Sequence, residues 1–381
     1  MSDRSLLGSA DVTDEELTLY AARQLGLDPD TCTLEGALVE DVDYELEAIT
    51  TGGRWWVTVD LGTPTGGHRV RFFVKLVHSW SRSPLFAQVP PEHREVAERL
   101  VPWRTEPLIY RSDLSDRLPP GLTMARAVDV RFLDEASAVV WLPEVDVVPW
   151  SWPAARLAHA AGLLGRLAAS QRVRGLSGIE ESDLQHGVRR YAEGRLGVQI
   201  GPMLHDHDLW RHPVLKECFG EDLRARLSGH FDRLPEYVDW LEAAPQGMSH
   251  GDACSNNLLV QPDSTDLVLI DYGFWGTQAL GFDLSQLLVG DVQIGRRPAA
   301  ELAGMEALCT PAYVEGLRAE GCDVPIEVVR RAHALQLLMF SGFSSFFFPE
   351  LQVPPSPEVC AMAAERAAIA RFAVDFVDAT A

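Results

Sequence analysis

The stretch that decides the fold reads HGDACSNNLLV over residues 250–260, QPDSTD over 261–266 and LVLIDYG over 267–273. The short apolar runs on either side of the Pro-Asp-Ser-Thr turn predict a β-hairpin. Pairing the two runs about this turn brings Asn257 and Asp271 side by side at the open end of the hairpin. Asp252, on the loop that leads into the hairpin, then faces the same space.

An Asn and two Asp side chains at one point indicate a particular chemistry. They provide hard oxygen ligands and a free carboxylate, which is what magnesium bound to nucleotide phosphates requires. Phosphoryl transfer also needs a carboxylate that orients and deprotonates the attacking hydroxyl. The spacing Asp-x4-Asn, followed by a strand and Asp-aromatic-Gly, matches the catalytic loop and the magnesium-binding Asp of protein kinases. A lone His-Gly-Asp would mean little, but the compound pattern favours phosphoryl transfer.

With HGDACSNN and LIDYG, the chain resembles the aminoglycoside phosphotransferase family. That family is part of the protein-kinase-like superfamily, which also holds choline kinases and other small-molecule kinases. The resemblance implies that Asp252 is the catalytic base, Asn257 a magnesium ligand and Asp271 the main magnesium ligand. It also implies that His250 and Asp283 brace the catalytic loop rather than react.

The segment before the hairpin is expected to hold the nucleotide. Strand-like runs at 44–49, 55–61 and 70–77 are separated by TTGGR and GTPTGGH, and the simplest interpretation is an antiparallel meander. Lys75 lies on the third of these strands, at the place of the kinase lysine that grips the α- and β-phosphates. Taken alone, a solvated strand lysine would be the commoner explanation, and only its place in the chain order favours a phosphate ligand.

Glu106 is our choice for the acidic partner of this lysine, with Glu95 and Glu98 as competitors. Pro107, directly after Glu106, would be awkward if Glu106 lay in the middle of a helix.

Gly52 and Gly53, in the predicted turn between the first two strands, sit where kinases place the loop that covers the phosphates. A plain type I′ hairpin turn explains the two glycines equally well. Residues 143–145 match the hinge that meets adenine through backbone groups, which makes Glu144 and Val145 nucleotide contacts.

Further elements complete a two-lobed α+β, protein-kinase-like fold. Apolar spacing predicts a helix from Asp14 to Leu27, one or two short helices within 90–114, and strands at 125–132 and 138–142. Ser151 is a plausible N-cap, with Pro153 in the first turn of a helix that runs to about Ser170. The expected lobes are residues 1–142, with an antiparallel sheet that binds the nucleotide, and 143–381, mainly helical and carrying the catalytic hairpin and the acceptor site.

Composition limits the partners of the 381-residue chain. Its 33 Lys and Arg against 55 Asp and Glu give a formal charge of −22, so nucleic acid or an anionic membrane is not expected as the main partner. A cationic substrate would suit this charge, although acidic surfaces also serve solubility alone. Six scattered cysteines without a Cys-x-x-Cys pair, and no apolar stretch of membrane-spanning length, predict a cytoplasmic protein. The oligomeric state stays open, and the first dozen residues are polar enough to fray.

Two other clusters have bland explanations. The stretch His205-Asp206-His207-Asp208, with His212 nearby, lacks an i, i+4 histidine pair, so a solvated loop between helices is favoured over a metal site. The aromatic run 340–348 is more typical of a core, with a minor role in the acceptor pocket left open.

The expected reaction moves the γ-phosphoryl group of ATP or GTP to a hydroxyl of a small molecule, with Mg²⁺ as cofactor. An antibiotic or another hydroxylated natural product is the first choice of acceptor, which would serve resistance or self-protection. Sugars, amino alcohols and nucleoside-type metabolites are the alternatives. A pseudokinase that binds nucleotide and regulates a partner is a further hypothesis, and the intact set Lys75, Asp252, Asn257 and Asp271 argues against it.

Overall fold

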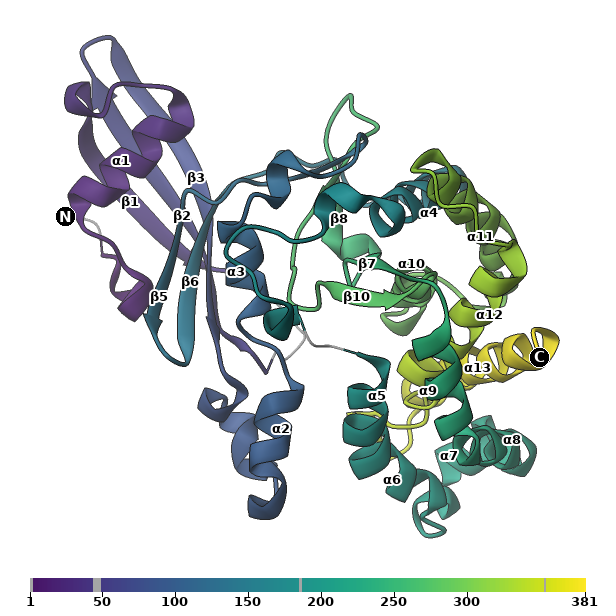
Figure 1. Cartoon of the computed structure of the whole chain (residues 1–381). Coiled ribbons are helices and arrows are strands. Elements are labelled where there is room, and N and C mark those ends of the chain that lie inside the picture. Colours follow the sequence, from purple (N-terminus) through teal and green to yellow (C-terminus); the bar gives the residue numbers. More distant parts are fainter. Residues whose placement is uncertain (1–2, 44–48, 185–186, 353) are drawn as a thin grey trace.

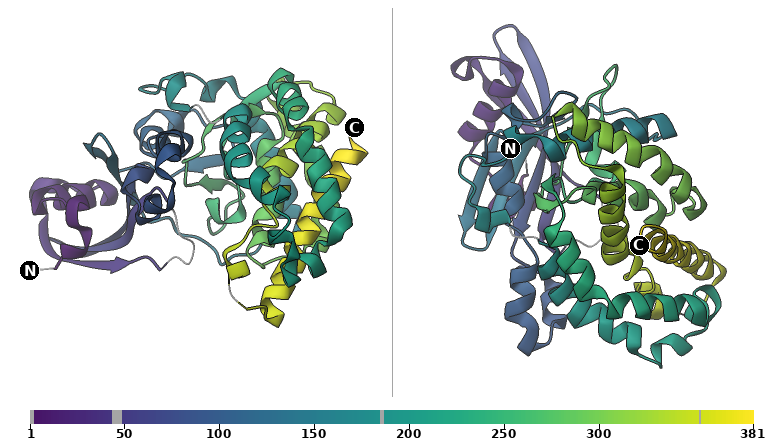
Figure 2. Two further views of the ribbon diagram at one scale, coloured as in Figure 1. Left: turned by 90° about the horizontal axis from the view of Figure 1, so that it is seen from below. Right: turned by 45° about the vertical axis from the view of Figure 1, so that its right-hand side comes forward.

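The computed structural model describes residues 3–43, 49–184, 187–352 and 354–381. A sheet-rich part and a mainly helical part lie at opposite ends of the molecule (Figures 1 and 2). This arrangement confirms the expected two-lobed, protein-kinase-like fold. Within the described residues, no helix combines the length and the apolar character that crossing a bilayer requires.

The sheet of the N-terminal part has five strands in the order β1-β2-β3-β6-β5, and each neighbouring pair is antiparallel. The strands are β1 (Thr33–Asp41), β2 (Thr51–Thr63), β3 (Gly66–His78), β5 (Asp129–Asp134) and β6 (Ser137–Pro143). Helix α1 (Asp14–Leu25) packs on one face, where it meets alternate side chains such as Val57, Val59 and Trp141. This alternation follows from the two-residue period of a strand.

The predicted meander is correct for its second and third strands, but its first strand is different. The run 44–49 lies almost entirely outside the described residues, and the first strand of the sheet is β1 instead. Most β1 side chains are exposed or half-buried, so no strict apolar alternation marks this strand in the sequence. Gly52 and Gly53 are not in a turn, because β2 already begins at Thr51.

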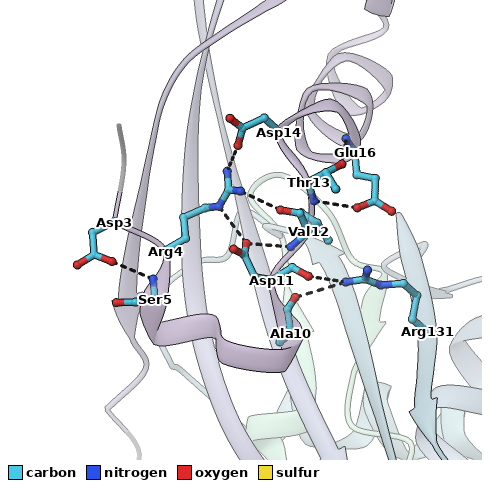
Figure 3. A network of polar contacts seen from close by, with 10 residues as sticks. All are labelled: Asp3, Arg4, Ser5, Ala10, Asp11, Val12, Thr13, Asp14, Glu16 and Arg131. Atoms are coloured by element: carbon cyan, nitrogen blue, oxygen red, sulfur yellow. Dashed lines mark hydrogen bonds and ion pairs between the residues drawn. The ribbon is translucent and has the colours of Figure 1, made fainter.

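The N-terminal residues are held in place, so the expectation that they fray was wrong for residues 3–12. Arg4 bonds Asp11 at 2.9 Å, Asp14 at 2.7 Å and the Val12 carbonyl at 2.8 Å (Figure 3). Arg131 on β5 donates to the carbonyl of Asp11 at 3.1 Å. The apolar side chains Leu7 and Ala10 are buried under this network.

The predicted helix from Asp14 is confirmed and ends at Leu25. Thr13 and Glu16 form a capping box at its start, and Gly26 ends it with a positive φ of 68°. The two short helices expected within 90–114 are α2 (Arg94–Leu100) and α3 (Thr105–Arg111).

The rest of the chain is mainly helical. Helix α4 (Ala154–Ala169) begins two residues later than expected, with Pro153 rather than Ser151 at the N-cap. It packs closely on α11 (Leu302–Ala319), because a Cβ on Gly165 would lie 2.0 Å from the carbonyl oxygen of Tyr313. The other α-helices are α5 (Val188–Tyr191), α6 (Gly201–His205), α7 (Pro213–Cys218), α8 (Gly220–Asp232), α9 (Leu234–Ala243), α10 (Phe282–Gln293), α12 (Ile326–Leu337) and α13 (Pro357–Ala379). π-helices span Ala192–Ile200 and Leu338–Gly342.

The predicted hairpin lies in the first of two small sheets. Strand β8 (Leu258–Val260) pairs antiparallel with β9 (Leu267–Leu269), which confirms the hairpin, and β4 (Leu122–Met124) runs parallel to β9. Strands β7 (Gln246–Ser249) and β10 (Gly276–Ala279) form the second sheet. The residues between β7 and β8 are thereby held at both ends.

The polar stretch 205–208 and the aromatic run 340–348 lie in different surroundings. Residues 206–208 form a loop between helical segments, with exposed side chains. In the described part of the chain, no group of three or more His, Cys, Asp or Glu side chains could hold a metal ion. Within the aromatic run, Phe343, Phe346 and Phe348 are buried in the core.

Candidate active site

The catalytic loop begins at the end of β7 and is fixed by a buried carboxylate. Asp283, in the first turn of α10, accepts hydrogen bonds from the backbone N–H groups of His250 and Gly251, both at 2.9 Å. Gly251 has a φ of 87°, and a Cβ there would lie 2.1 Å from the carbonyl oxygen of Phe274. Only glycine fits this position without displacing backbone.

His250 is fully buried and joins the loop to the hairpin. Burial lowers its pKa to about 4, so the ring is neutral at physiological pH. Its Nε2 donates to the Ile270 carbonyl at 2.9 Å, and its Nδ1 accepts from the N–H of Asp252 at 3.3 Å. The ring therefore connects the strand before Asp271 to the backbone of Asp252, which fits a bracing role.

Asp252 and Asn257 lie in direct contact. The Asn257 Nδ2 donates to the Asp252 carbonyl at 2.9 Å and to its Oδ2 at 3.0 Å. Burial, followed by the negative charge of Asp271, raises the pKa of Asp252 to about 6, although the Asn257 hydrogen bond works in the other direction. A carboxylate with this pKa is ionised at neutral pH and can still take up a proton, as a general base must.

Asp271 follows β9 and faces the N-terminal sheet. Its φ of 63° is in the left-handed region, one of two such values among the described non-glycine residues. Its Oδ1 lies 3.2 Å from the Lys75 Nζ, an ion pair between the two parts of the molecule. Burial opposes ionisation of Asp271, but the charge of Lys75 outweighs it, so its pKa is lowered.

Lys75 is buried on β3 and pairs with Glu106, as chosen from the sequence. Their atoms Nζ and Oε2 are 2.7 Å apart, and the side chains are 8% and 6% exposed. Glu98 bonds Ser79 and Ser81 instead. Pro107 presents no difficulty because α3 begins at Thr105, so the proline lies in the first turn, where its missing N–H is not needed.

The carboxylates of Glu106 and Asp271 thus both contact the ammonium of Lys75. Burial opposes the charge on Lys75, but Asp271 and Glu106 together outweigh it and raise the lysine pKa. Burial raises the pKa of Glu106 to about 7, even though Lys75 pulls it down. The cluster therefore holds a charged lysine between an ionised Asp271 and a Glu106 that is readily protonated.

The oxygen donors fit a magnesium ion. Since the Asn257 amide nitrogen points to Asp252, its Oδ1 is the atom left to bind a cation, and the Asp271 carboxylate is 40% exposed. Amide and carboxylate oxygens are the hard ligands that magnesium prefers.

The remaining predicted nucleotide residues lie near β3. Glu144 follows β6, donates its N–H to the Arg71 carbonyl at 2.9 Å, and accepts from the Arg71 guanidinium at 3.2 Å. Val145 is partly buried against the large core. Gly52 lies at a register shift between β2 and β3, and Gly53 pairs with Leu76.

Sequence reasoning missed a second set of contacts on the catalytic loop. Trp150 donates its Nε1–H to Ser255 at 3.1 Å, and Ser255 donates to the buried Asp291 at 2.5 Å. Arg296 bonds Asn256 at 2.5 Å and lies 5.5 Å from the centroid of the Trp150 ring. These partners are far apart in the chain and belong to no motif, so no sequence signal indicated them.

Comparison with known proteins places these residues in a family. The model of the phosphotransferase enzyme family, APH, matches residues 65–318. A search of curated proteins found no match.

Several solved structures match this chain over most of its length. An amicoumacin kinase, hAmiN, in complex with AMP-PNP, Ca²⁺ and Ami has 13% identity and a TM-score of 0.48, with 99% of this chain and 96% of that chain covered. An aminoglycoside phosphotransferase from Alicyclobacillus acidocaldarius has 16% identity and a TM-score of 0.47, with 89% and 91% covered. A choline kinase from Cryptosporidium parvum has 12% identity and a TM-score of 0.46, with 96% and 95% covered.

Proposed function

The chain belongs to the phosphotransferase enzyme family and is a small-molecule kinase, and from this premise we propose that it moves the γ-phosphoryl group of ATP or GTP to a hydroxyl group. The observation that carries this proposal is the meeting of Lys75, Asp252, Asn257 and Asp271. Lys75 on β3 contacts Asp271 at 3.2 Å, and Asn257 contacts Asp252 at 2.9 and 3.0 Å. The ring of His250 links the two pairs, because it bonds the Asp252 N–H and the carbonyl of Ile270, the residue before Asp271.

Each residue has a role that its surroundings support. Asp252 accepts the proton of the acceptor hydroxyl, and Asn257 holds its carboxylate in place. Lys75, oriented by Glu106, binds the nucleotide phosphates. Asn257 and Asp271 would hold magnesium, which would supply positive charge to the phosphates when bound.

The nucleotide base would lie along the segment after β6. Glu144 and Val145 are the residues we assign to it through backbone groups, and the pairing of the Glu144 N–H with the Arg71 carbonyl fixes this segment beside β3. We place Gly52 and Gly53 beside the phosphates, at the start of β2. We also keep residues 1–142 as the nucleotide lobe and 143–381 as the catalytic lobe.

An antibiotic or another hydroxylated natural product is our first choice of acceptor. Support comes from the family and from relatives of this fold that act on such compounds, among them the amicoumacin kinase and the aminoglycoside phosphotransferase. A metabolite such as an amino alcohol is the alternative, in line with the choline kinase. A cytoplasmic location would supply the nucleotide and would keep the six cysteines, none of which forms a disulfide in the structure, reduced.

The test is a screen of antibiotics and metabolites with ATP or GTP and magnesium, read by mass spectrometry as the gain of one phosphoryl group. Asp252→Ala is the negative control. Full activity of this variant on the true acceptor would overturn the assignment of the base. Stabilisation by Mg-ATP without turnover on any acceptor would favour the pseudokinase hypothesis instead.

A further inference from the structure

The face of the N-terminal sheet that carries Lys75 also carries a second cationic side chain, Arg54. In the antiparallel register of β2 and β3, Arg54 is the direct partner of Lys75. Side chains of directly opposed residues lie on the same face of a sheet. Arg54 therefore lies on the face that Lys75 presents to Asp271, opposite the face covered by α1.

The neighbours of Arg54 along β2 confirm which face it occupies. Trp55 and Val57 are buried in the core that α1 covers, so Arg54 and Trp56 lie on the other side of the strand. On that side, Trp56 meets Phe73 with ring centroids 5.3 Å apart. Arg54, Trp56, Phe73 and Lys75 thus share one surface of the sheet.

The backbone of Arg54 is fixed on both sides, and its side chain is directed along β2. Its carbonyl accepts from the Val42 N–H at 3.0 Å, which continues the pairing with β1. Its Nη2 lies 3.4 Å from the Thr51 hydroxyl, toward the glycine end of the strand. Arg54 thus shares with Lys75 the surface of the sheet on which Lys75 meets Glu106 and Asp271.

The charges around Lys75 suggest a role for Arg54. The Lys75 ammonium already has carboxylate oxygens at 2.7 and 3.2 Å, so two anionic partners offset its charge. A triphosphate brought to this site needs more positive charge than a neutralised lysine provides. A guanidinium offers a planar fork of N–H donors that matches phosphate oxygens, and it stays charged at any physiological pH.

We propose that Arg54 binds the phosphates of the nucleotide donor beside Lys75, as a phosphate-binding residue of this chain. The inference rests on the proposed function, because it takes the Lys75 surface as the nucleotide site. It goes beyond that function by assigning part of the phosphate contact to a side chain that follows the two glycines, rather than to their backbone alone.

The test is nucleotide binding by titration calorimetry to the full chain, with Mg-ATP, Mg-ADP and adenosine as probes and no acceptor present. Arg54→Gln removes the charge and the guanidinium and leaves a shorter, neutral polar side chain. We expect Mg-ATP and Mg-ADP to bind roughly 10- to 100-fold more weakly, as for the loss of a hydrogen bond to a charged group. Adenosine has no phosphate, so its affinity should not change.

Two further variants make the result specific. Arg54→Lys keeps the charge but loses the planar fork, and it should bind Mg-ADP with intermediate affinity. Arg69→Gln is the matched control, because Arg69 is an exposed arginine on β3 that pairs with Asp60 at 2.7 Å. It should bind all three probes like the wild type.

Melting temperatures separate binding from folding. If Arg54→Gln and Arg54→Lys are both folded and both bind Mg-ADP like the wild type, the proposal is overturned. An equal loss of adenosine binding would also overturn it, since that would mean a distorted site. If Arg54→Gln does not fold, the result for Arg54→Lys decides.

Lys75→Met distinguishes failure of this inference from failure of the proposed function. If Lys75→Met loses Mg-ATP binding and Arg54→Gln does not, only the inference on Arg54 is wrong. If neither variant changes the affinity, the Lys75 surface is not the nucleotide site, and both proposals are overturned.

Discussion

The catalytic loop and the Lys75 cluster are held by different kinds of interaction. In the catalytic loop, the buried side chains of His250 and Asp283 bond backbone groups at 2.9 Å, all within the helical part of the molecule. In the Lys75 cluster, charged side chains bond one another, and the pair with Asp271 joins the two parts. Bonds to backbone keep their geometry whether or not a ligand is present. Charged side chains can exchange partners, so a nucleotide bound at Lys75, as proposed, could rearrange the cluster.

The largest expected effect tests the loop half of this comparison. Asp252→Asn removes the proton acceptor but keeps the hydrogen-bonding shape, so kcat should fall by about 10²- to 10⁴-fold while the protein stays folded. The measurement is steady-state kinetics with the acceptor found by the screen. Asp263→Asn is the control, because Asp263 is an exposed aspartate on the turn between β8 and β9 with a φ of 56°, which asparagine tolerates. A kcat for Asp252→Asn within threefold of the control would contradict the role of Asp252.

The next effect tests the cluster half. Lys75→Met leaves Glu106 and Asp271 without their cation, so the free energy of unfolding should fall by about 3–5 kcal/mol, as when one partner of a buried pair is lost. The double variant Lys75→Met/Glu106→Gln should recover part of this loss, because the stranded carboxylate is gone. Urea denaturation at pH 7 measures both values.

A matched surface pair gives the baseline for that experiment. Arg69→Gln with Asp60→Asn removes an exposed pair at 2.7 Å and should leave the urea midpoint unchanged. If Lys75→Met behaved like this surface pair, the cluster would not be a buried unit.

A smaller loss is expected at Asp283. Asp283→Asn keeps one acceptor oxygen but removes the charge that two backbone N–H groups share, so the free energy of unfolding should fall by about 1–3 kcal/mol. The kcat of Asp283→Asn should also fall, while its affinity for the nucleotide should stay the same. Asp323→Asn, an exposed position, serves as the control. An unchanged stability for Asp283→Asn would show that the loop does not depend on this carboxylate.

The smallest effect is a pH dependence with opposite signs for activity and stability. Since the pKa of Asp252 is raised from 3.8 to about 6, kcat/KM should rise with pH up to about 6 and then level off. The pH–rate profile should show no step near pH 6.5 from His250, because the pKa of this histidine is lowered to about 4.

The free energy of unfolding changes with pH in the opposite direction to the activity, through the same carboxyl group of Asp252. Between pH 3.8 and about 6, the folded state binds this proton more tightly than the unfolded state, so the contribution of Asp252 to stability is lost as pH rises. Asp252→Asn should therefore gain stability relative to the wild type between pH 4 and pH 7. Denaturation at both pH values checks this, and a difference that is constant with pH would contradict the raised pKa.

The part of the site that could be predicted from the sequence is the part that local spacing determines. Asn257 and Asp271 lie at the open end of one hairpin, and Asp252 lies on the loop that leads into it. A short turn fixes how the strands of the hairpin pair. Glu106 was chosen with Glu95 and Glu98 still in competition, and the structure pairs it with Lys75 at 2.7 Å. The start of α3 at Thr105 removes the objection raised by Pro107.

The rest depends on contacts between residues far apart in the chain. Strand β1 has no strict apolar alternation and is held by its pairing with β2. The N-terminal residues look polar, yet Arg4 and Arg131 fix them through bonds that span up to 121 residues. The bond from Trp150 to Ser255 spans 105 residues. No propensity or spacing within one segment encodes such pairings.

The parallel pairing of β4 with β9 has a consequence for how the molecule can move. The chain leaves α3, pairs through β4 beside the catalytic hairpin, and returns to the N-terminal sheet as β5 and β6 before it enters α4. Leu114, Leu118 and Leu122, on this excursion, are buried in the large core of the helical part. Several chain segments therefore link the two parts, unlike two bodies joined by a single flexible linker. Such a connection restrains wide opening and leaves a small rocking motion, for which the Lys75–Asp271 pair would act as the latch.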